Sequence, residues 1–125
     1  SGEWSSSSDI RMKKDIHPAG GMLEKSMKLK PSWFRFKNGD AQAPESLGFI
    51  AQEVNEVLPS LVNRNADHWT LNYAGMSTVA IGAVQEQQAL IEKQAERIGR
   101  LESENAALAK RLERLEAALQ TMAAQ

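Results

Sequence analysis

The carboxy-terminal part of the chain repeats apolar residues at heptad spacing. With Val84 at position a, the a and d positions run through six heptads without interruption, and nine of these twelve positions are apolar. Such a repeat predicts a left-handed coiled coil over residues 74–125, about 78 Å long at a rise of ~1.5 Å per residue. The residues expected to line its oligomerisation seam are Val84, Ile91, Ile98, Leu101, Asn105, Leu108, Leu112, Leu115 and Leu119.

The heptad pattern by itself fits both a dimer and a trimer. Asn105 at an a position and the leucines at d favour two strands, whereas the amides Gln87 and Gln94 at d suit a wider, three-stranded core. In a parallel arrangement Arg97 at g faces Glu102 at e of a neighbouring helix, and the two charges are opposite. The pattern therefore predicts a parallel oligomer whose register is fixed by the buried amides.

Before the predicted coiled coil, the apolar pattern changes period several times over short distances, with Pro and Gly at the breaks. Alternation is typical of strands, and spacings of three and four are typical of helices. The predicted elements are an arm or short strand at 9–16, helices at 22–29 and 52–58, strands at 32–37 and 69–73, and a strand or strand-to-helix entry at 47–51. The fold class is therefore α+β, with a small mixed head followed by a long carboxy-terminal helix that forms a parallel trimeric or dimeric coiled coil.

Composition separates the same two parts and excludes several functions. All seven aromatic residues precede position 74. Fifteen Lys and Arg against 16 Asp and Glu give a net charge of -1, so general binding to nucleic acid or to an anionic membrane is not expected. The chain has no Cys and only two His, and its apolar runs fall well short of the ~20 residues of a membrane span. No metal, cofactor or membrane partner is predicted.

The head is small for a stable core of its own, because about 75 residues is near the size at which oligomerisation supplies missing stability. Trp33 and Trp69 are expected to contribute to this core. His17 and His68 are expected to be ordinary surface or turn residues. A self-associating protein follows from this size as well as from the heptads.

The amino-terminal arm holds a nucleophile and a base close together in a basic segment, namely Ser8 and Lys13. A serine hydroxyl needs a base to become a nucleophile, and a lysine amine serves when it is neutral. A spacing of five aligns two side chains in neither a strand nor a helix. Their meeting therefore requires a bend in the chain, or a lysine donated by another subunit. Taken alone, the segment also fits a solvated tail.

Residues 8–16, Ser-Asp-Ile-Arg-Met-Lys-Lys-Asp-Ile, closely resemble the opening motif of the carboxy-terminal intramolecular chaperone domains of phage tail spikes and tail fibres. These are the auto-cleaving domains of endosialidase spikes and L-shaped tail fibres. The resemblance extends over about 8–95, while 96–125 is a generic coil. Further blocks in the family's order are the aromatic stretch 30–37, Gly-Phe-Ile-Ala-Gln-Glu-Val at 48–54, and the segments 57–62, 71–73 and 80–91.

The resemblance implies a homotrimeric chaperone that aligns an amino-terminal fibrous or β-helical passenger of the same polypeptide and then cuts itself off. By position, Ser8 is the nucleophile and Lys13 the base of a self-cleaving serine endopeptidase, acting in cis or across the trimer. Asp9 and Arg11 match the remaining motif positions and are assigned to orienting the arm. The bond cut is Ser7-Ser8.

The implied organisation has three parts: a passenger remnant or linker at 1–7, a chaperone head with the autocleavage motif at 8–73, and a coiled-coil oligomerisation helix at 74–125. Ser1 and Gly2 are expected to be a remnant of tag removal on a fragment of a longer protein. The implied location is the host cytoplasm during phage assembly, with the domain released from the mature virion fibre.

Two alternatives stand beside this interpretation. The first is a trimeric coiled-coil attachment module of a fibre protein that cleaves nothing. The second is an enzyme acting on an external polysaccharide, whose carboxylate pair would be Glu53 and Glu56, although their spacing is typical of a solvated helix face. The spacing of five also suggests a further hypothesis, that Ser8 and Lys13 meet only in the assembled trimer, so that cutting reports on assembly.

Overall fold

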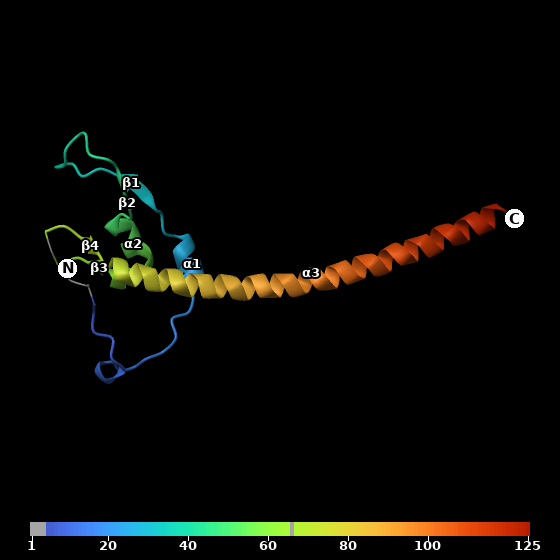
Figure 1. The fold of residues 1–125 in the computed structure, drawn as a ribbon, viewed down its shortest axis with the longest axis horizontal. Helices are drawn as coiled ribbons and strands as arrows, with labels where there is room; N and C mark the ends of the chain where they lie inside the picture. Colours follow the sequence, from blue (N-terminus) through green and yellow to red (C-terminus); the bar gives the residue numbers. More distant parts are fainter. Residues whose placement is uncertain (1–4, 66) are drawn as a thin grey trace. The chain divides into compact units, whose positions relative to one another are not determined.

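The computed structural model describes residues 5–65 and 67–125. The chain divides into two compact units, Ser1–Gly82 and Ala83–Gln125. A mixed head followed by a long helix confirms the predicted α+β class. In chain order (Figure 1) the elements are the 3-10 turn η1 (Ile10–Met12), α1 (Met22–Met27), β1 (Ser32–Phe34), β2 (Ser46–Gly48), α2 (Ala51–Val57), the 3-10 turn η2 (Pro59–Leu61), β3 (Val62–Asn63), β4 (Thr70–Leu71) and α3 (Tyr73–Ala123).

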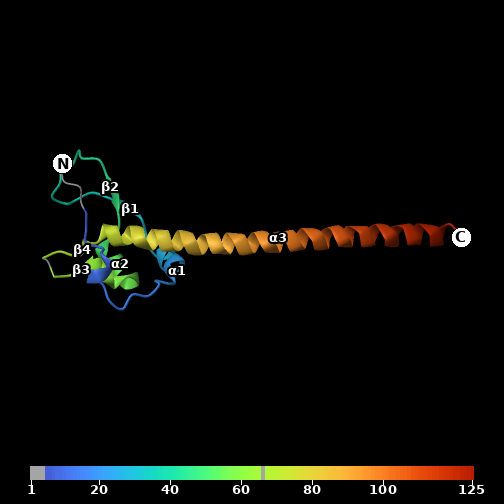
Figure 2. The ribbon, with the colours of Figure 1, turned by 60° about the horizontal axis from the view of Figure 1, so that its bottom comes forward.

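Two small antiparallel sheets frame the head. In the first, β1 pairs with β2 and Trp33 lies opposite Leu47. In the second, β3 pairs with β4 and Val62 lies opposite Leu71. Helix α2 connects the two sheets in the chain, and Figure 2 shows it beside β3 and β4. The second sheet carries the chain directly into α3.

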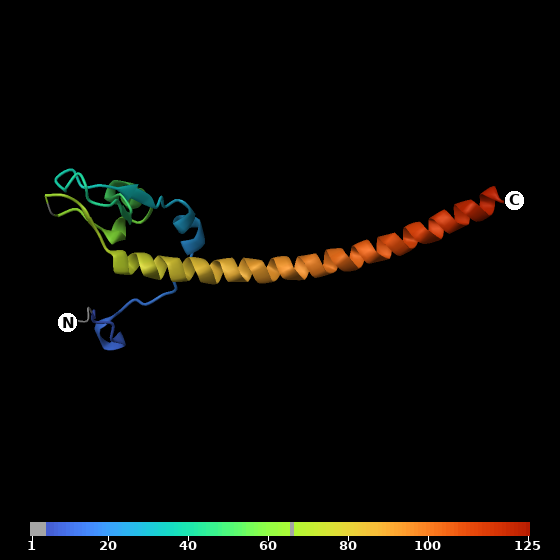
Figure 3. The ribbon, with the colours of Figure 1, turned by 45° about the horizontal axis from the view of Figure 1, so that its top comes forward.

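The core of the head gathers side chains from both short helices, β3 and the first turns of α3. Val54 is the most deeply buried of them, at 1% exposed. Figure 3 shows α1 beside the first turns of α3. At Gly82 the two helices approach so closely that a Cβ atom would lie 2.7 Å from Met22 Cγ. The buried members of this core are Met22, Val54, Leu58, Val62, Met76 and Val79.

Asn72 fixes the point at which α3 begins. Its side-chain Oδ1 accepts a hydrogen bond from the Gly75 N–H at 3.0 Å, which satisfies one of the free donors of the first turn. Its own N–H donates to the Leu61 carbonyl at 2.8 Å and so ties the start of the helix to η2. Met76 and Val79, three residues apart, then face the core.

Beyond the head, the heptad positions of α3 are exposed in the single chain. Every residue from 87 to 125 is exposed, and the apolar residues predicted for the seam are 44% to 63% exposed. The helix is continuous through all six predicted heptads, as far as Ala123. No helix in the described part of the chain is long and apolar enough to cross a membrane.

The strand predictions need correction at both ends of the head. Residues 9–16 contain no strand, because the Asp9 side chain accepts a hydrogen bond from the Arg11 N–H and favours a turn instead. The strand predicted at 69–73 is shortened to Thr70–Leu71, because Asn72 caps α3. Turn η2 and strand β3 were not predicted from the sequence, since residues 59–63 show no period.

The prediction that the two tryptophans belong to the core is wrong. Trp33 is 64% exposed and Trp69 is 36% exposed. In β1, alternation turns Ser32 and Phe34 inward and Trp33 outward. Trp69 directly precedes the two-residue strand β4. The single chain therefore leaves large aromatic surface uncovered.

Candidate active site in the amino-terminal arm

A local turn shapes the arm. The Asp9 carboxylate accepts a hydrogen bond from the Arg11 N–H at 2.9 Å, and the Asp9 carbonyl accepts one from the Met12 N–H at 3.0 Å. The Lys13 N–H then donates to the Ile10 carbonyl at 3.1 Å and closes the 3-10 turn η1. Asp is well suited to start such a turn, because its short side chain bonds the backbone two residues on. The sequence therefore places a bend directly after Ser8.

A charged fork reinforces this turn. Arg11 Nη2 lies 2.6 Å from Asp9 Oδ2, and Arg11 Nε donates to both carboxylate oxygens at 3.1 Å. The Arg11 side chain, followed by its backbone N–H, holds the pKa of Asp9 below the usual value of 3.8. The same carboxylate raises the pKa of Arg11. Asp9 and Arg11 thus hold each other's side chains in place, which agrees with the predicted role of orienting the arm.

The turn brings the predicted nucleophile and base together within one chain. Lys13 Nζ donates a hydrogen bond to Ser8 Oγ at 2.8 Å. A 3-10 turn rises only ~2 Å per residue, against ~3.3 Å in a strand, so it shortens the span between the two side chains. The sequence left two possibilities open, a bend in the chain or a lysine donated by another subunit. The structure contains the bend. This contact within one chain contradicts the hypothesis that Ser8 and Lys13 meet only in the assembled trimer.

Contact alone does not make this pair reactive. A lysine acts as a base only in its neutral form, which removal from water favours. Ser8 and Lys13 are both exposed in the single chain. The arm therefore brings the Lys13 amine to the Ser8 hydroxyl, and both groups remain in water in the single chain.

The other candidate residues are spread over the head. Glu53 and Glu56 lie on α2, and His17 Nδ1 lies 3.3 Å from the Pro18 carbonyl in the exposed arm. His68 lines a pocket that is described below. The described residues contain no group of three His, Cys, Asp or Glu side chains placed to hold a metal ion.

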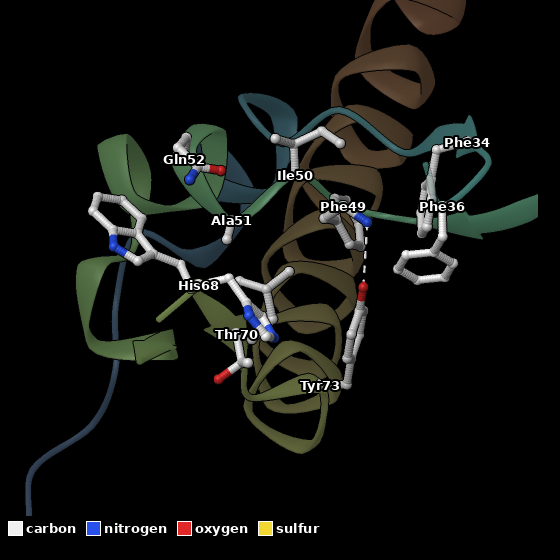
Figure 4. Close-up of a pocket in the computed structure, with 11 residues that line it drawn as sticks. Phe34, Phe36, Phe49, Ile50, Ala51, Gln52, His68, Thr70 and Tyr73 are labelled. Atoms are coloured by element: carbon white, nitrogen blue, oxygen red, sulfur yellow. Dashed lines mark hydrogen bonds between the residues drawn. The ribbon is translucent and has the colours of Figure 1, made fainter. Parts of the chain in front are cut away.

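A second site, missed in the sequence, is an open pocket in the head with a volume of about 480 Å³ (Figure 4). Its aromatic walls come from three segments and include Phe34, Phe49 and Tyr73. Tyr73 Oη accepts a hydrogen bond from the Phe49 N–H at 3.4 Å, which joins the start of α3 to the segment before α2. Gly48 permits this approach, because a Cβ there would lie 2.7 Å from Tyr73 Oη. The sequence feature that could have indicated this pocket is the position of all seven aromatic residues before residue 74.

Comparison with known families finds a match over the part of the chain that contains the arm. Residues 8–63 match the family Peptidase_S74, described as the chaperone of endosialidase. The match begins at Ser8 and includes the arm, both short helices and β1 to β3. It confirms the resemblance noted in the sequence for these residues, while the blocks at 71–73 and 80–91 lie outside it. No curated protein matches the chain.

Proposed function

Residues 8–63 belong to the chaperone of endosialidase family, and we propose on this basis that the chain is a trimeric intramolecular chaperone that cuts itself at the Ser7-Ser8 bond. The observation that carries the proposal is the 2.8 Å hydrogen bond from Lys13 Nζ to Ser8 Oγ. Ser8 is also the first residue of the matched segment, and the family's name contains the word peptidase, which supports the proposal.

The proposed reaction uses only these side chains and water. Neutral Lys13 Nζ takes the proton from Ser8 Oγ, and the oxygen attacks the carbonyl carbon of Ser7. The C–N bond breaks as the new ammonium returns its proton to the Ser8 nitrogen, which leaves an ester between the Ser7 carbonyl and Ser8 Oγ. Water then hydrolyses this ester, releasing a carboxylate at Ser7 and a free amino terminus at Ser8.

The exposed heptad face of α3 supports trimerisation. An apolar stripe that is 44% to 63% exposed along a single helix gains stability when it is buried against copies of itself. The glutamines at d favour the wider core of three helices, which agrees with the trimer implied by the resemblance.

A trimer suits the chaperone task. Three chains of a fibrous or β-helical passenger can pair in several registers, and aligning their ends is slow because the contacts are far apart in sequence. A coiled coil raises the local concentration of the three ends and fixes their stagger. Cutting then removes the template and makes unfolding of the passenger slower. We place this action in the host cytoplasm during phage assembly, before release from the fibre.

The test is self-cutting by a longer chain that carries part of its passenger. Ser8→Ala abolishes the cut, and Lys13→Ala slows it by about 10²- to 10⁴-fold, the usual contribution of a general base. Ser6→Ala and Lys37→Ala, which change exposed residues of the same types outside the dyad, cut at the parental rate. A denaturing gel over time gives the rates. A parent that does not cut, or equal cutting in all variants, supports the non-cleaving attachment module instead.

A further inference from the structure

The first turns of α3 carry no charged residue, although one side of them lies in water. Residues 69–85 contain no Asp, Glu, Lys or Arg, whereas 86–116 contain thirteen. The side of the helix that bears Met76 and Val79 is buried in the head, while Ile81 is 61% exposed. An uncharged helix segment is typical of one that protein encloses on several sides. The single chain thus leaves a face of this segment for another surface to cover.

A second pocket of the head lies beside this segment, with a volume of about 310 Å³ and walls from the end of α1, the segment before α2, and α3. Among the described residues that line it, the polar side chains are Ser26 and Ser77. Both hydroxyls already donate to carbonyls of their own helices, at 2.8 Å to Leu23 and at 2.6 Å to Ala74. The pocket is therefore suited to an aliphatic side chain and offers a polar ligand no free hydroxyl donor.

The heptad register extends into this pocket. Counted back from Val84, Ser77 occupies an a position and Ala80 a d position. Both residues line the pocket, and both are exposed. Their side chains are small, and small side chains at a contact allow two helices to approach closely. The pocket therefore borders the seam that is predicted for the coil.

The same register indicates which side chain reaches the pocket from a second copy. In a parallel coil, a g residue faces the e residue five positions later in the neighbouring helix, as Arg97 faces Glu102. Met76 is at g and Ile81 is at e, so Ile81 of a neighbouring copy faces Met76. Met76 lines the pocket, whereas Ile81 of the same chain does not. The pocket is thus open within one chain and lies opposite an exposed isoleucine of the next.

Taking the trimer of the proposed function as given, we infer that Ile81 of each copy fills the apolar pocket of the next copy. Burial of the isoleucine and of the pocket walls removes apolar surface from water and stabilises the assembly. The contact joins two different surfaces, and three such contacts close a ring. Each head is then held by a neighbouring α3, so the heads as well as the coil set the alignment of the three chains.

Disulfide trapping tests this contact, because the chain has no Cys of its own. Ser26→Cys chains and Ile81→Cys chains are folded together, oxidised gently and separated on a non-reducing gel, with the linked peptides identified by mass. Each chain carries one cysteine, so a 26–81 link joins two copies, and we expect this link. Thr78→Cys in place of Ile81→Cys is the matched control. Thr78 is exposed on the same turns of α3 at a b position, outside the seam, and gives no link to residue 26.

The outcomes separate this inference from the proposed function. A mixture that is trimeric by mass, yet forms no 26–81 link, leaves the pocket to another occupant and overturns the inference while the proposed function stands. Equal linking by Ile81→Cys and Thr78→Cys also overturns it, because the contact would then be unspecific. A chain that is monomeric by mass overturns the proposed function and this inference together.

Ile81→Ala measures what the contact contributes to assembly. Loss of three buried methyl or methylene groups would leave each pocket partly empty, so we expect the protein concentration at which half of the trimer dissociates to rise at least tenfold. Alanine is the better helix former, so an Ile81 that stayed in water would give no rise. Thr78→Ala is the control and leaves the trimer at least as stable as the parent. Sedimentation equilibrium that gives the same dissociation for the parent and Ile81→Ala contradicts the filling of the pocket.

Discussion

Asp9 is the residue on which the geometry of the arm depends. Its carboxylate bonds both the backbone and the side chain of Arg11, and the turn that results brings Lys13 to Ser8. Because the bonds favour the charged form, the pKa of Asp9 is lowered. A lowered pKa means that the stabilising contribution is fully present above the unfolded value and is lost as pH falls through the folded one. The turn should therefore loosen only in acid.

An NMR titration of the Asp9 carboxyl carbon measures this effect. In the parent chain the midpoint lies below the usual value of 3.8, and Arg11→Met moves it upward toward that value, because the side-chain bond is the larger cause of the shift. The shift remains incomplete, because the backbone N–H of residue 11 still donates. An unchanged midpoint in Arg11→Met would show that the fork does not exist in solution.

Gly48 tests the contact that joins α3 to the head. Gly48→Ala places a Cβ 2.7 Å from Tyr73 Oη and 3.2 Å from a Phe34 ring carbon, so the tyrosine must move and lose its bond to the Phe49 N–H. We expect a loss of about 1–3 kcal/mol in the free energy of unfolding, measured with denaturant at fixed protein concentration.

Gly99→Ala is the matched control for Gly48→Ala. Gly99 lies inside α3, and nothing would stand within 4 Å of its Cβ. Alanine in an exposed helix interior is expected to stabilise by about 0.5–1 kcal/mol. If both alanine variants unfold alike, the close approach at Gly48 has no energetic consequence.

At the scale of the elements, the sequence predicted what depends on long periodic patterns. Helix α3 extends through every predicted heptad, and both short helices begin and end within a few residues of the predicted positions. The short strands were less predictable, because two- and three-residue strands carry almost no period and depend on pairing partners. The meeting of Ser8 and Lys13 was not predictable from regular spacing, since the Asp9 side chain sets the bend. The aromatic pocket depends on segments far apart in the chain.

The heptad assignment of α3 is tested by a pair of neighbouring substitutions. Leu108→Asp puts a carboxylate at a predicted d position, where each copy in an oligomer would bury an unpaired charge, so the assembly should dissociate. Ala107→Asp, at the adjacent c position, carries the same acid outside the seam. It loses only about 0.7 kcal/mol of helix propensity per chain and stays assembled. Sedimentation equilibrium that gives the same mass for both variants would contradict the assignment.

At the scale of the whole molecule, the proposed function divides the work between the two compact units. The coil, within Ala83–Gln125, sets the number of copies, and the unit Ser1–Gly82 carries the arm and the aromatic pocket. The contact between Ser8 and Lys13 is built into one chain. Under the proposed function, cutting also requires a neutral Lys13 amine, because only the neutral form accepts the serine proton.

Native mass measurement of the assembled protein tests this account most directly, because one spectrum reports both the number of copies and the residue at which each begins. The account predicts three copies, each beginning at Ser8 after loss of residues 1–7. A stable single chain, or a trimer of uncut chains that persists on incubation, would contradict it.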